Sequence, residues 1–493
     1  MLDHNCRKVF ALLLILCFLL PAPAVAAARP EDEPLKGSVP ASSLVLEQES
    51  LSDGSEYEPV PVYADTLLIG LSYDQSAVDE AAFKNAEGLG FRFGSLDEDR
   101  VFHATSETDA SELNVRIEQN WYVLLDEVFA SEEDAESVAG RYFGKIVRLG
   151  GERRVLIGPF KNEQEVRYTI RWNGLTAKAW HESCFVVYDG DGRFLTLFAD
   201  TDELALEAVS GGKARTEYQD EQYCGAFLLR RWEEDRMTVV NVVGLEDYVK
   251  GVIPYEMSPD WPPEALKAQA VCARSYAAWN LGAYAEDYGF DLTDDTESQV
   301  YRGVNGADAV TDAAVDATAG QFVRWHGQLC EVYYFSSDGG YTEDGANIFG
   351  SDQPYLVGKT DPFEPALDFA VMKWDRWRSG DWIAERLQKE GYEIGSVAAL
   401  EPAYSELGNV IGMRYLDAQG NCVQLETRDA YKFLLLDSAC FTVEKEDDGF
   451  RFTGRGWGHN CGMSQWGAHA MASVYGMTAE EIIGFYFTGA YIG

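Results

Sequence analysis

The segment YVKGVIPYEMSPDWPPEALKAQAVCARSYAAWN, residues 248–280, joins a proline-rich turn to a strongly patterned helix. Pro263 suits the first helical position, and Glu264 complements the positive end of the helix dipole. Apolar residues then recur at spacings of four, three and four, at Leu266, Ala270, Ala273 and Ala277. Residues with this spacing share one helical face. The segment therefore predicts a helix that begins at Pro263 and buries one stripe.

One carboxylate, Glu256, lies ahead of this helix among prolines 254, 259, 262 and 263. Proline fixes φ and removes a backbone donor, so the chain around Glu256 is expected to form a stiff, irregular turn. Such a turn is one way to present a chemical group. For this segment taken alone, an ordinary core helix after an ordinary loop is the favoured interpretation.

The composition of the chain limits its domain count and its partners. At 493 residues it is too long for one compact core, and 46% hydrophobic residues are enough to build several. The 82 acidic and 40 basic residues give a net charge of −42. Because nucleic-acid binding depends on Lys and Arg that neutralise phosphates, this surface excludes it as an expected function. Beyond residue 28 the seven cysteines form no C-x-x-C pair, so no disulfide framework or zinc knuckle is indicated.

Residues 1–28 have the pattern of a signal peptide. A basic start precedes the apolar run Val9–Leu20, and Ala24–Ala26 is a cleavage candidate. The protein is therefore expected outside the cytoplasm, secreted or associated with the cell wall. Retention of residues 9–28 as a membrane anchor is the alternative. Residues 29–65 are acidic and rich in Pro and Ser, which predicts a disordered linker.

Three segments of different pattern follow the linker. Residues 66–118 combine β-prone runs with glycine turns and predict a β-rich region. Residues 119–172 predict a strand, a helix, a strand pair and a second helix, with caps at Ser131 and Asn162. Residues 173–219 predict a β-hairpin region.

Four short motifs in the second of these segments carry a family resemblance. They are Trp121-Tyr122-Val123, the helix start Ser131–Ala135, the pair Gly150-Gly151 and the turn Val155–Phe160. Their succession resembles the SPOR family of peptidoglycan-binding modules. The resemblance implies a small ferredoxin-like module that binds glycan strands, stripped of their stem peptides, on the face of an antiparallel sheet. A packing domain of the same shape is the alternative.

Three later clusters combine glycines with hydroxyl, amide and aromatic side chains. They are Asp294–Tyr301, Tyr334–Glu343 and Gly454–Gly467. Such residues line sugar sites, because amides and hydroxyls satisfy sugar hydroxyls while aromatic faces cover the CH surface of the ring. For the first cluster a solvated turn is an equal alternative. His459, in the third cluster, is equally suited to a cleft and to a structural role.

Motifs in one order from about residue 218 to the C-terminus resemble the SpoIID/LytB family, the stage II sporulation proteins D. They are Leu245–Tyr248, Gly251–Met257, Glu264–Tyr276, Phe335–Asn347, Pro354–Leu356 and Gly456–Gly467. The form of Phe335–Glu343 is closer to the lytic transglycosylase branch than to the amidase-enhancer branch. The resemblance implies a catalytic domain over residues 220–493.

By this resemblance Glu256 is the catalytic acid and base of a peptidoglycan lytic transglycosylase. One acid suffices if the 6-hydroxyl of the sugar replaces water as nucleophile. An ordinary Glu is ionised at neutral pH, so its pKa must be raised to about 6 or more before it can protonate a glycosidic oxygen. Asp260 lies nearby in sequence and keeps open a two-carboxylate hydrolase.

Eleven further residues are expected to line the cleft, although those on the helix are equally suited to brace the loop. They are Lys267, Gln269, Arg274, Tyr276, Gln299, Ser336, Ser337, Tyr341, His459, Ser464 and Gln465. The zinc ligands of some sporulation members, one His and two Cys, have no counterpart between Asp291 and Ala319, so no metal and no other cofactor is expected. A second departure is Asn460-Cys461, where the family usually has Gly and a small apolar residue.

The sequence thus predicts an exported, multidomain α+β protein. Its catalytic domain, of the SpoIID type, would follow a β-rich region and a ferredoxin-like module of the SPOR type. The expected partners are peptidoglycan glycan strands and other cell-wall or sporulation proteins. The rival interpretation is a non-catalytic wall-binding protein that stimulates an amidase.

Overall fold

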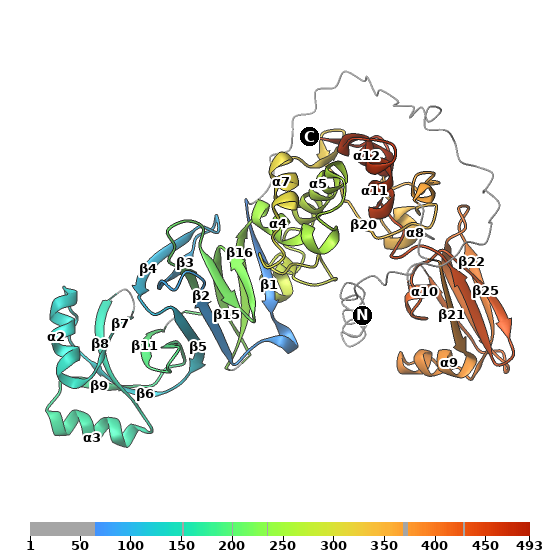
Figure 1. Cartoon of the computed structure of the whole chain (residues 1–493). Helices are drawn as coiled ribbons and strands as arrows, with labels where there is room; N and C mark the ends of the chain where they lie inside the picture. Colours follow the sequence, from blue (N-terminus) through green and yellow to red (C-terminus); the bar gives the residue numbers. More distant parts are fainter. Residues whose placement is uncertain (1–64, 150–151, 200, 234, 368–372, 427–428) are drawn as a thin grey trace, which may run out of the picture. The chain divides into compact units, whose positions relative to one another are not determined.

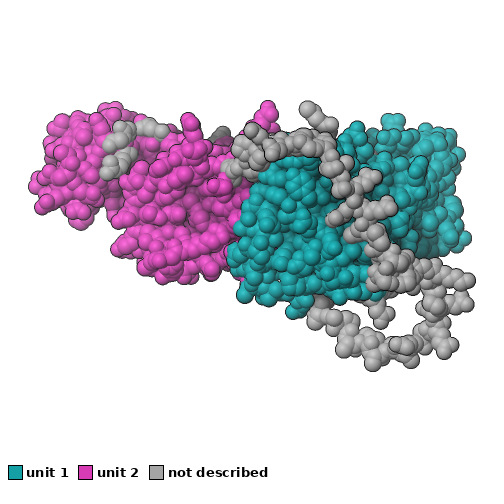
Figure 2. Space-filling view, turned by 90° about the horizontal axis from the view of Figure 1, so that it is seen from above, with its two compact units in different colours: residues 1–62, 256–279, 308–493 teal, residues 63–255, 280–307 magenta. Residues whose placement is uncertain are grey.

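The computed structural model describes residues 65–493 except 150–151, 200, 234, 368–372 and 427–428 (Figure 1). The expected signal peptide and nearly all of the expected linker lie outside these residues. The described chain combines helices with several β-sheets, which confirms the expected multidomain α+β class. It divides into two compact units, coloured separately in Figure 2. Unit 1 contains residues 256–279 and 308–493, and unit 2 contains residues 65–255 and 280–307.

Unit 2 contains a seven-stranded sheet whose strand order is β17-β1-β16-β15-β12-β3-β4. Its strands are β1 (Thr66–Ser72), β3 (Phe91–Leu96), β4 (Phe102–Thr108), β12 (Glu203–Ala208), β15 (Ala226–Trp232), β16 (Arg236–Gly244) and β17 (Leu292–Thr293). Apolar side chains from β1, β12, β15 and β16 form one core cluster with Phe290. Short helices η3 (Asp74–Ser76) and α6 (Ala285–Tyr288) complete this part.

A ten-stranded sheet of unit 2 has the order β14-β13-β2-β5-β10-β11-β7-β8-β6-β9. Its strands are β2 (Glu80–Asn85), β5 (Glu112–Glu118), β6 (Trp121–Leu125), β7 (Lys145–Leu149), β8 (Glu152–Phe160), β9 (Ala177–Trp180), β10 (Cys184–Asp189), β11 (Phe194–Phe198), β13 (Arg215–Tyr218) and β14 (Glu221–Cys224). The expected boundaries at residues 119, 173 and 220 therefore fall within one hydrogen-bonded sheet. The last of them falls inside the β13–β14 hairpin.

The segment expected to form a separate module runs β6, α2 (Glu132–Tyr142), β7, β8, α3 (Glu163–Asn173), β9. The predicted caps are confirmed, because Ser131 accepts a bond from the Asp134 backbone and Asn162 from the Glu165 backbone. Side chains from alternate positions of β6 enter two different cores. Val123 packs with α2 and α3 residues, whereas Leu124 packs with residues of β10 and β11. Both faces of this part of the sheet are therefore buried.

Helix α5 (Pro263–Trp279) of unit 1 begins at the predicted residue, and α7 (Ala309–Ala317), α11 (Gln465–Ser473) and α12 (Ala479–Tyr486) pack against it. Two shorter helices, α8 (Gly345–Phe349) and η4 (Glu364–Ala366), belong to the same unit. Strands β18 (Val323–Trp325), β19 (Gln328–Leu329) and β28 (Tyr491–Ile492) form one small sheet, and β20 (Tyr334–Phe335) and β27 (Met463–Ser464) form another. Leu266, Ala270, Ala273 and Ala277 are all fully buried, as predicted, but Gln269, Arg274 and Ser275 are fully buried as well, so burial of α5 is not limited to one stripe.

An inserted α/β part of unit 1 lies between the second and third motif clusters of the chain. Its sheets are β21-β26-β25, from β21 (Trp374–Ser379), β25 (Phe441–Glu446) and β26 (Gly449–Gly454), and β22-β23-β24, from β22 (Val397–Tyr404), β23 (Val410–Asp417) and β24 (Cys422–Glu426). Helices α9 (Gly380–Lys389) and α10 (Asp429–Lys432) accompany them. These elements share one core cluster of their own.

The expected irregular turn around Glu256 is wrong in its position. Helix α4 (Leu245–Glu256) includes Pro254 and ends at Glu256, so irregular chain begins only at Met257. Val249, Val252 and Ile253 are fully buried, and this packing outweighs the cost of a proline near the helix end. Of the helices that the structure describes, none is both long and apolar enough to span a bilayer.

Candidate active site

Two short parallel strands bring the second and third motif clusters together. In the β20–β27 pair, Tyr334 lies opposite Met463 and Phe335 lies opposite Ser464. Backbone hydrogen bonds continue the pairing, from Met463 N to Tyr333 O at 3.0 Å and from Trp466 N to Ser336 O at 2.9 Å. Side chains more than 120 residues apart in sequence therefore project beside one another.

The Glu256 carboxyl is held by one residue from each of these clusters. Gln465 Nε2 donates to Glu256 Oε2 at 3.0 Å, and the Tyr334 hydroxyl donates to Glu256 Oε1 at 3.4 Å. Burial raises the pKa of Glu256 to about 7, and the two hydrogen bonds oppose this rise. The group is therefore divided between its protonated and ionised forms near neutral pH. An acid of this kind can both donate and accept a proton.

Both ring nitrogens of His459 are hydrogen-bonded to backbone groups, so this side chain has a structural role. Its Nε2 lies 3.0 Å from Tyr334 O, and its Nδ1 accepts a hydrogen bond from Cys461 N at 3.2 Å. A carbonyl only accepts and an amide only donates, so Nε2 carries the proton and the ring is neutral. The His459 ring also contacts Phe335 and Phe349. It fixes the backbone of the residue whose hydroxyl reaches Glu256.

Three aromatic side chains that follow Glu256 or Gln465 closely in the sequence pack against one another. Trp261, five residues beyond Glu256, lies 4.5 Å from the ring of Trp466, which follows Gln465. His469 packs edge-on to Trp261 at 4.9 Å. All three rings keep some exposed surface. Aromatic faces of this kind can cover the apolar face of a sugar ring.

Four of the residues expected to line the cleft have no exposed surface at all. Gln269 and Arg274 have no exposed surface, and Arg274 donates to backbone carbonyls, among them Gln321 O at 3.1 Å. Ser337 and Ser464 are also fully buried and both donate to the carboxylate of Glu364. Arg274, Ser337 and Ser464 brace the loops through these bonds, whereas the side-chain amide of Gln269 has no hydrogen-bond partner among the described residues.

The other expected residues have varied surroundings. Lys267 pairs with Glu264 at 2.7 Å, Tyr276 and Ser336 are partly exposed, and Tyr341 accepts a bond from Cys440 Sγ at 3.1 Å. Gln299 belongs to unit 2, where it accepts a bond from Tyr248. Of the residues predicted for the cleft, Gln465 hydrogen-bonds to Glu256.

Tyr334 is the contact of Glu256 that sequence reasoning did not select. It opens the motif cluster at 334–343, but nothing in its spacing separates it from Tyr333 or Tyr341. Only the β20–β27 register shows which tyrosine points at the carboxyl.

The departure at Asn460 is explained by the backbone. Its φ is 63°, in the left-handed region where glycine is usual and asparagine is the best tolerated substitute. The buried Asn460 amide donates to Asp338 O and to Asn409 Oδ1, both at 3.2 Å. The loop therefore keeps the backbone conformation that the family's glycine would give.

Two other carboxyls bear on the two-carboxylate alternative. Asp260 is exposed and forms no ion pair among the described residues. Asp294, in unit 2, has its pKa raised to about 7 by burial and by Asp295. Within unit 1, the Glu256 carboxyl accepts hydrogen bonds from the side chains of Gln465 and Tyr334.

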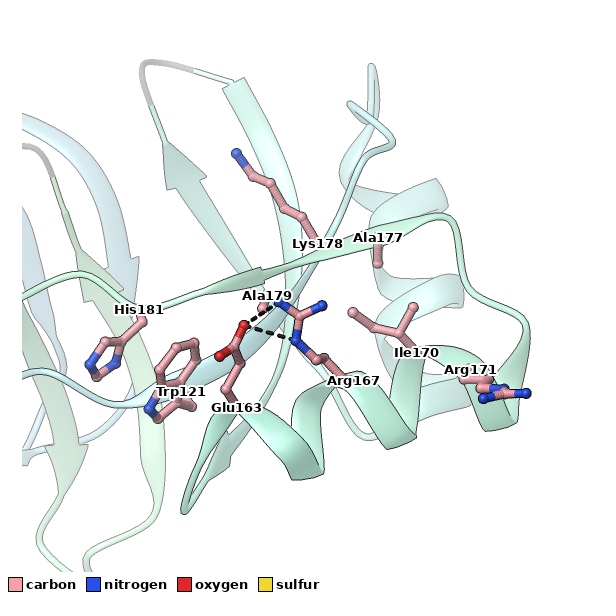
Figure 3. A pocket seen from close by; sticks show the side chains of 9 residues that line it. All are labelled: Trp121, Glu163, Arg167, Ile170, Arg171, Ala177, Lys178, Ala179 and His181. Carbon is pink, nitrogen blue, oxygen red and sulfur yellow. Dashed lines mark hydrogen bonds and ion pairs between the residues drawn. The ribbon is translucent and has the colours of Figure 1, made fainter.

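A separate pocket of about 790 Å³ lies in unit 2, between α3 and β9 (Figure 3). Trp121 stacks on His181 with ring centroids 4.0 Å apart and planes 2° apart. Beside this stack lies the ion pair of Arg167 and Glu163 on α3. His181 Nδ1 is buried and has no hydrogen-bond partner among the described residues. The pocket joins an aromatic platform to polar groups.

The fold and the site define a class: a multidomain α+β protein in which a side-chain amide and a phenol bind one partly buried acid, close to partly exposed aromatic rings.

Comparisons with known proteins agree with this class. The family model of SpoIID, stage II sporulation protein, matches residues 233–325. Stage II sporulation protein D of Bacillus subtilis is 32% identical over 270 residues, which are 51% of this chain and 75% of that protein. An uncharacterized protein of Brachyspira hyodysenteriae is 34% identical over 276 residues, 54% of this chain and 71% of that protein. The chain belongs to the SpoIID family.

The similarity also extends to the other branch of the family. The amidase enhancer of Bacillus subtilis is 28% identical over 289 residues, 49% of this chain and 39% of that protein. The chain therefore spans well under half of the length of this relative.

Proposed function

We propose that the protein is a peptidoglycan lytic transglycosylase that cleaves the bond between N-acetylmuramic acid and N-acetylglucosamine, with Glu256 as its single acid and base. The observation that carries this proposal is the position of the Glu256 carboxyl between Gln465 and Tyr334, with a pKa of about 7. Membership of the SpoIID family supports a cell-wall function connected with sporulation.

The proposed reaction needs no second carboxylate and no water. Protonated Glu256 gives its proton to the glycosidic oxygen while the bond from that oxygen to C1 of the muramic acid breaks. The 6-hydroxyl oxygen of the same sugar then bonds to C1, and its proton passes to the Glu256 carboxylate. The product is a 1,6-anhydro end, and the acid is restored. Gln465 and Tyr334 stabilise the carboxylate between the two transfers, because both donate to it.

The β6–β9 segment is proposed as a glycan-holding module of ferredoxin-like topology. Support comes from its order of strands and helices and from the sheet order β7-β8-β6-β9. The face on which SPOR family members bind glycan is packed here with Tyr122, Leu124 and Leu156. The pocket at Trp121 and His181 is therefore the surface we assign to sugar binding in this module. Action outside the cytoplasm, on glycan strands and beside other cell-wall proteins, completes the proposal.

The test compares wild type with Glu256→Gln on purified glycan strands, with and without stem peptides. Wild type is expected to produce 1,6-anhydro ends, detected by mass spectrometry, and the variant to lose at least ~100-fold in rate. The matched control is Glu385→Gln, which makes the same change on α9 in the inserted part of unit 1. Equal products from wild type and Glu256→Gln would refute the role of Glu256, and ordinary reducing ends would indicate a hydrolase.

The second candidate is a non-catalytic protein that stimulates an amidase, favoured by the similarity to the amidase enhancer. Binding of glycan strands by wild type without any cleavage product, together with faster peptide release by an added amidase, would support it.

A further inference from the structure

Three carboxyl groups meet in the interior of unit 1, beneath the β20–β27 pair. Asp338, Asp361 and Glu364 each offer one oxygen, and these oxygens lie within 4.8 Å of one another. Exposed fractions of 0% for Asp338 and 1% for each of the others show that water does not solvate them. Asp338 belongs to the motif cluster Tyr334–Glu343, but none of the three is among the predicted site residues.

The charge of this group is not balanced by protein. Among the described residues, no Lys, Arg or His side chain bonds to any of the three carboxyls. Asp361 accepts from Phe363 N at 2.7 Å and from the Tyr486 hydroxyl at 2.6 Å. Glu364 accepts from Asp338 N at 3.0 Å and from Ser464 Oγ at 2.8 Å, as well as from Ser337. Neutral donors orient these oxygens but leave three buried negative charges, which are costly unless they are paired or neutralised.

One oxygen of the group has no donor at all. Asp338 Oδ1 accepts from Gly340 N at 2.7 Å, whereas the buried Asp338 Oδ2 has no hydrogen-bond partner in the described structure. The Asp338 carboxyl nevertheless lies within hydrogen-bonding reach of the side chains of Asp361 and Glu364. Two carboxylates approach so closely only when a proton or a cation lies between them.

We propose that Asp338, Asp361 and Glu364 form a binding site for a divalent cation, and that the cation is Ca²⁺. Oxygen ligands are those that Ca²⁺ prefers, and its ligand distances of about 2.3–2.6 Å allow oxygens as far as ~4.8 Å apart to share one ion. Each of the three carboxylates offers one oxygen to a shared ion, and further oxygens would complete the six to eight ligands that Ca²⁺ takes. His and Cys, the ligands of a structural zinc site, are absent from the group.

The carboxyl cluster is linked to the candidate active site through two adjacent residues, Ser464 and Gln465. Glu364 accepts from Ser464, and the next residue, Gln465, donates to Glu256. Ser337 and Asp338, which also bond to Glu364, follow Tyr334 in the second cluster. A cation here would hold in place the two loops that carry both hydrogen-bond partners of Glu256. This placement gives the site a structural role and no part in bond cleavage.

The competing explanation is that protons alone neutralise the group. Burial and the neighbouring carboxyls raise the pKa of Asp338 well above its ordinary value, and burial raises the pKa of Glu364. The two explanations differ in their response to Ca²⁺ and to Asp338→Asn. A neutral amide weakens a cation site, whereas it relieves the repulsion in a metal-free group.

The experiment measures ion binding and thermal stability at pH 7.5, with cleavage of glycan left out of the readout. Chelator-treated wild type, Asp338→Asn, Glu364→Gln and the control Asp352→Asn are titrated with Ca²⁺ by calorimetry, and the stoichiometry is read by native mass spectrometry. Asp352 is an exposed acid of the same unit with no side-chain bond in the described structure. Mg²⁺ serves as the second ion.

Wild type and Asp352→Asn are expected to bind one Ca²⁺ per chain and to gain thermal stability from it, with weaker binding of Mg²⁺. Asp338→Asn and Glu364→Gln are expected to lose about 100-fold in affinity, because the site loses a charged ligand. Absence of Ca²⁺ binding to wild type at millimolar concentration would overturn the proposal without reference to any variant. Undiminished affinity in both site variants would overturn it as well, and failure of one variant to fold leaves the other to decide.

Discussion

The pKa of the Glu256 carboxyl reflects a competition between burial and hydrogen bonding. Burial raises it from 4.5 to about 7, although Gln465 and Tyr334 both favour the ionised form. Desolvation is therefore the larger effect, but the two donors keep the pKa of Glu256 close to neutral pH. A carboxyl without them would stay protonated, and it could not easily accept the second proton of the proposed reaction.

The pH dependence of cleavage tests this balance. The first step needs protonated Glu256, so kcat/KM is expected to fall about tenfold per unit as pH rises above about 7. Below this pH the acid is already protonated, and the same group contributes no further gain. The measurement is a pH-rate profile on stripped glycan strands. A profile that stays flat from pH 6 to 9 would contradict the assignment.

Two variants test whether the hydrogen bonds to Glu256 determine the pH at which activity falls. Gln465→Leu removes the 3.0 Å donor to the ionised carboxyl, so the pKa is expected to rise and the limb to move to higher pH. Tyr334→Phe removes the 3.4 Å donor and is expected to shift the limb in the same direction by less. Shifts toward lower pH would show that these groups do not act on Glu256 as the distances indicate.

At the scale of elements, helix α11 approaches α12 at a glycine. A Cβ added to Gly467 would lie 1.8 Å from the Tyr486 hydroxyl and 2.5 Å from Asp361 Oδ2. A glycine is required there because the partner is a buried tyrosine that is hydrogen-bonded to a buried acid. Gly484, on α12, has no atom closer than 3.9 Å to its own added Cβ.

These two glycines predict opposite effects of the same substitution. Gly467→Ala is expected to destabilise unit 1 by about 1–3 kcal/mol, because the side chain forces Tyr486 away from Asp361. Gly484→Ala is expected to stabilise it by ~0.5–1 kcal/mol through helix propensity. Denaturant unfolding, followed by tryptophan fluorescence, compares the two. Equal and small changes would show that α11 and α12 are not packed this closely.

At the scale of the whole molecule, the continuous ten-stranded sheet opposes an independent module. The face of β6 that carries Tyr122 and Leu124 is buried against side chains of β10 and β11. A fragment of residues 119–181 lacks both of those strands and would expose this apolar face to water. It is therefore expected to associate and to bind a hydrophobic dye.

The fragment is measured by light scattering and by dye fluorescence, with a triple variant, Tyr122→Ser, Leu124→Thr and Leu156→Thr, as its control. The control removes the apolar face and is expected to reduce both association and dye binding. A wild-type fragment that is monomeric and binds no dye would instead show that residues 119–181 fold as an independent module.

Local sequence patterns were sufficient for several of the elements. Pro263, the alanine stripe of α5, and the caps at Ser131 and Asn162 are short-range features, and their consequences hold because helix starts depend on neighbouring residues. Glu256 was selected from its motif as the candidate acid, and that role stays a prediction. The start of the turn was misplaced, because burial of Val249, Val252 and Ile253 against the rest of the protein outweighs the local penalty of Pro254 and lets the helix continue to Glu256.

By itself the sequence determined the α+β class, the family and the candidate acid, since these depend on composition and on motifs that lie in order along the chain. Tertiary structure alone decided which side chains reach Glu256, which of the predicted cleft residues are buried, and that Asp338, Asp361 and Glu364 meet. The physical reason is range: β20 and β27 pair residues that are about 130 positions apart, and no local pattern encodes the register of such a pair.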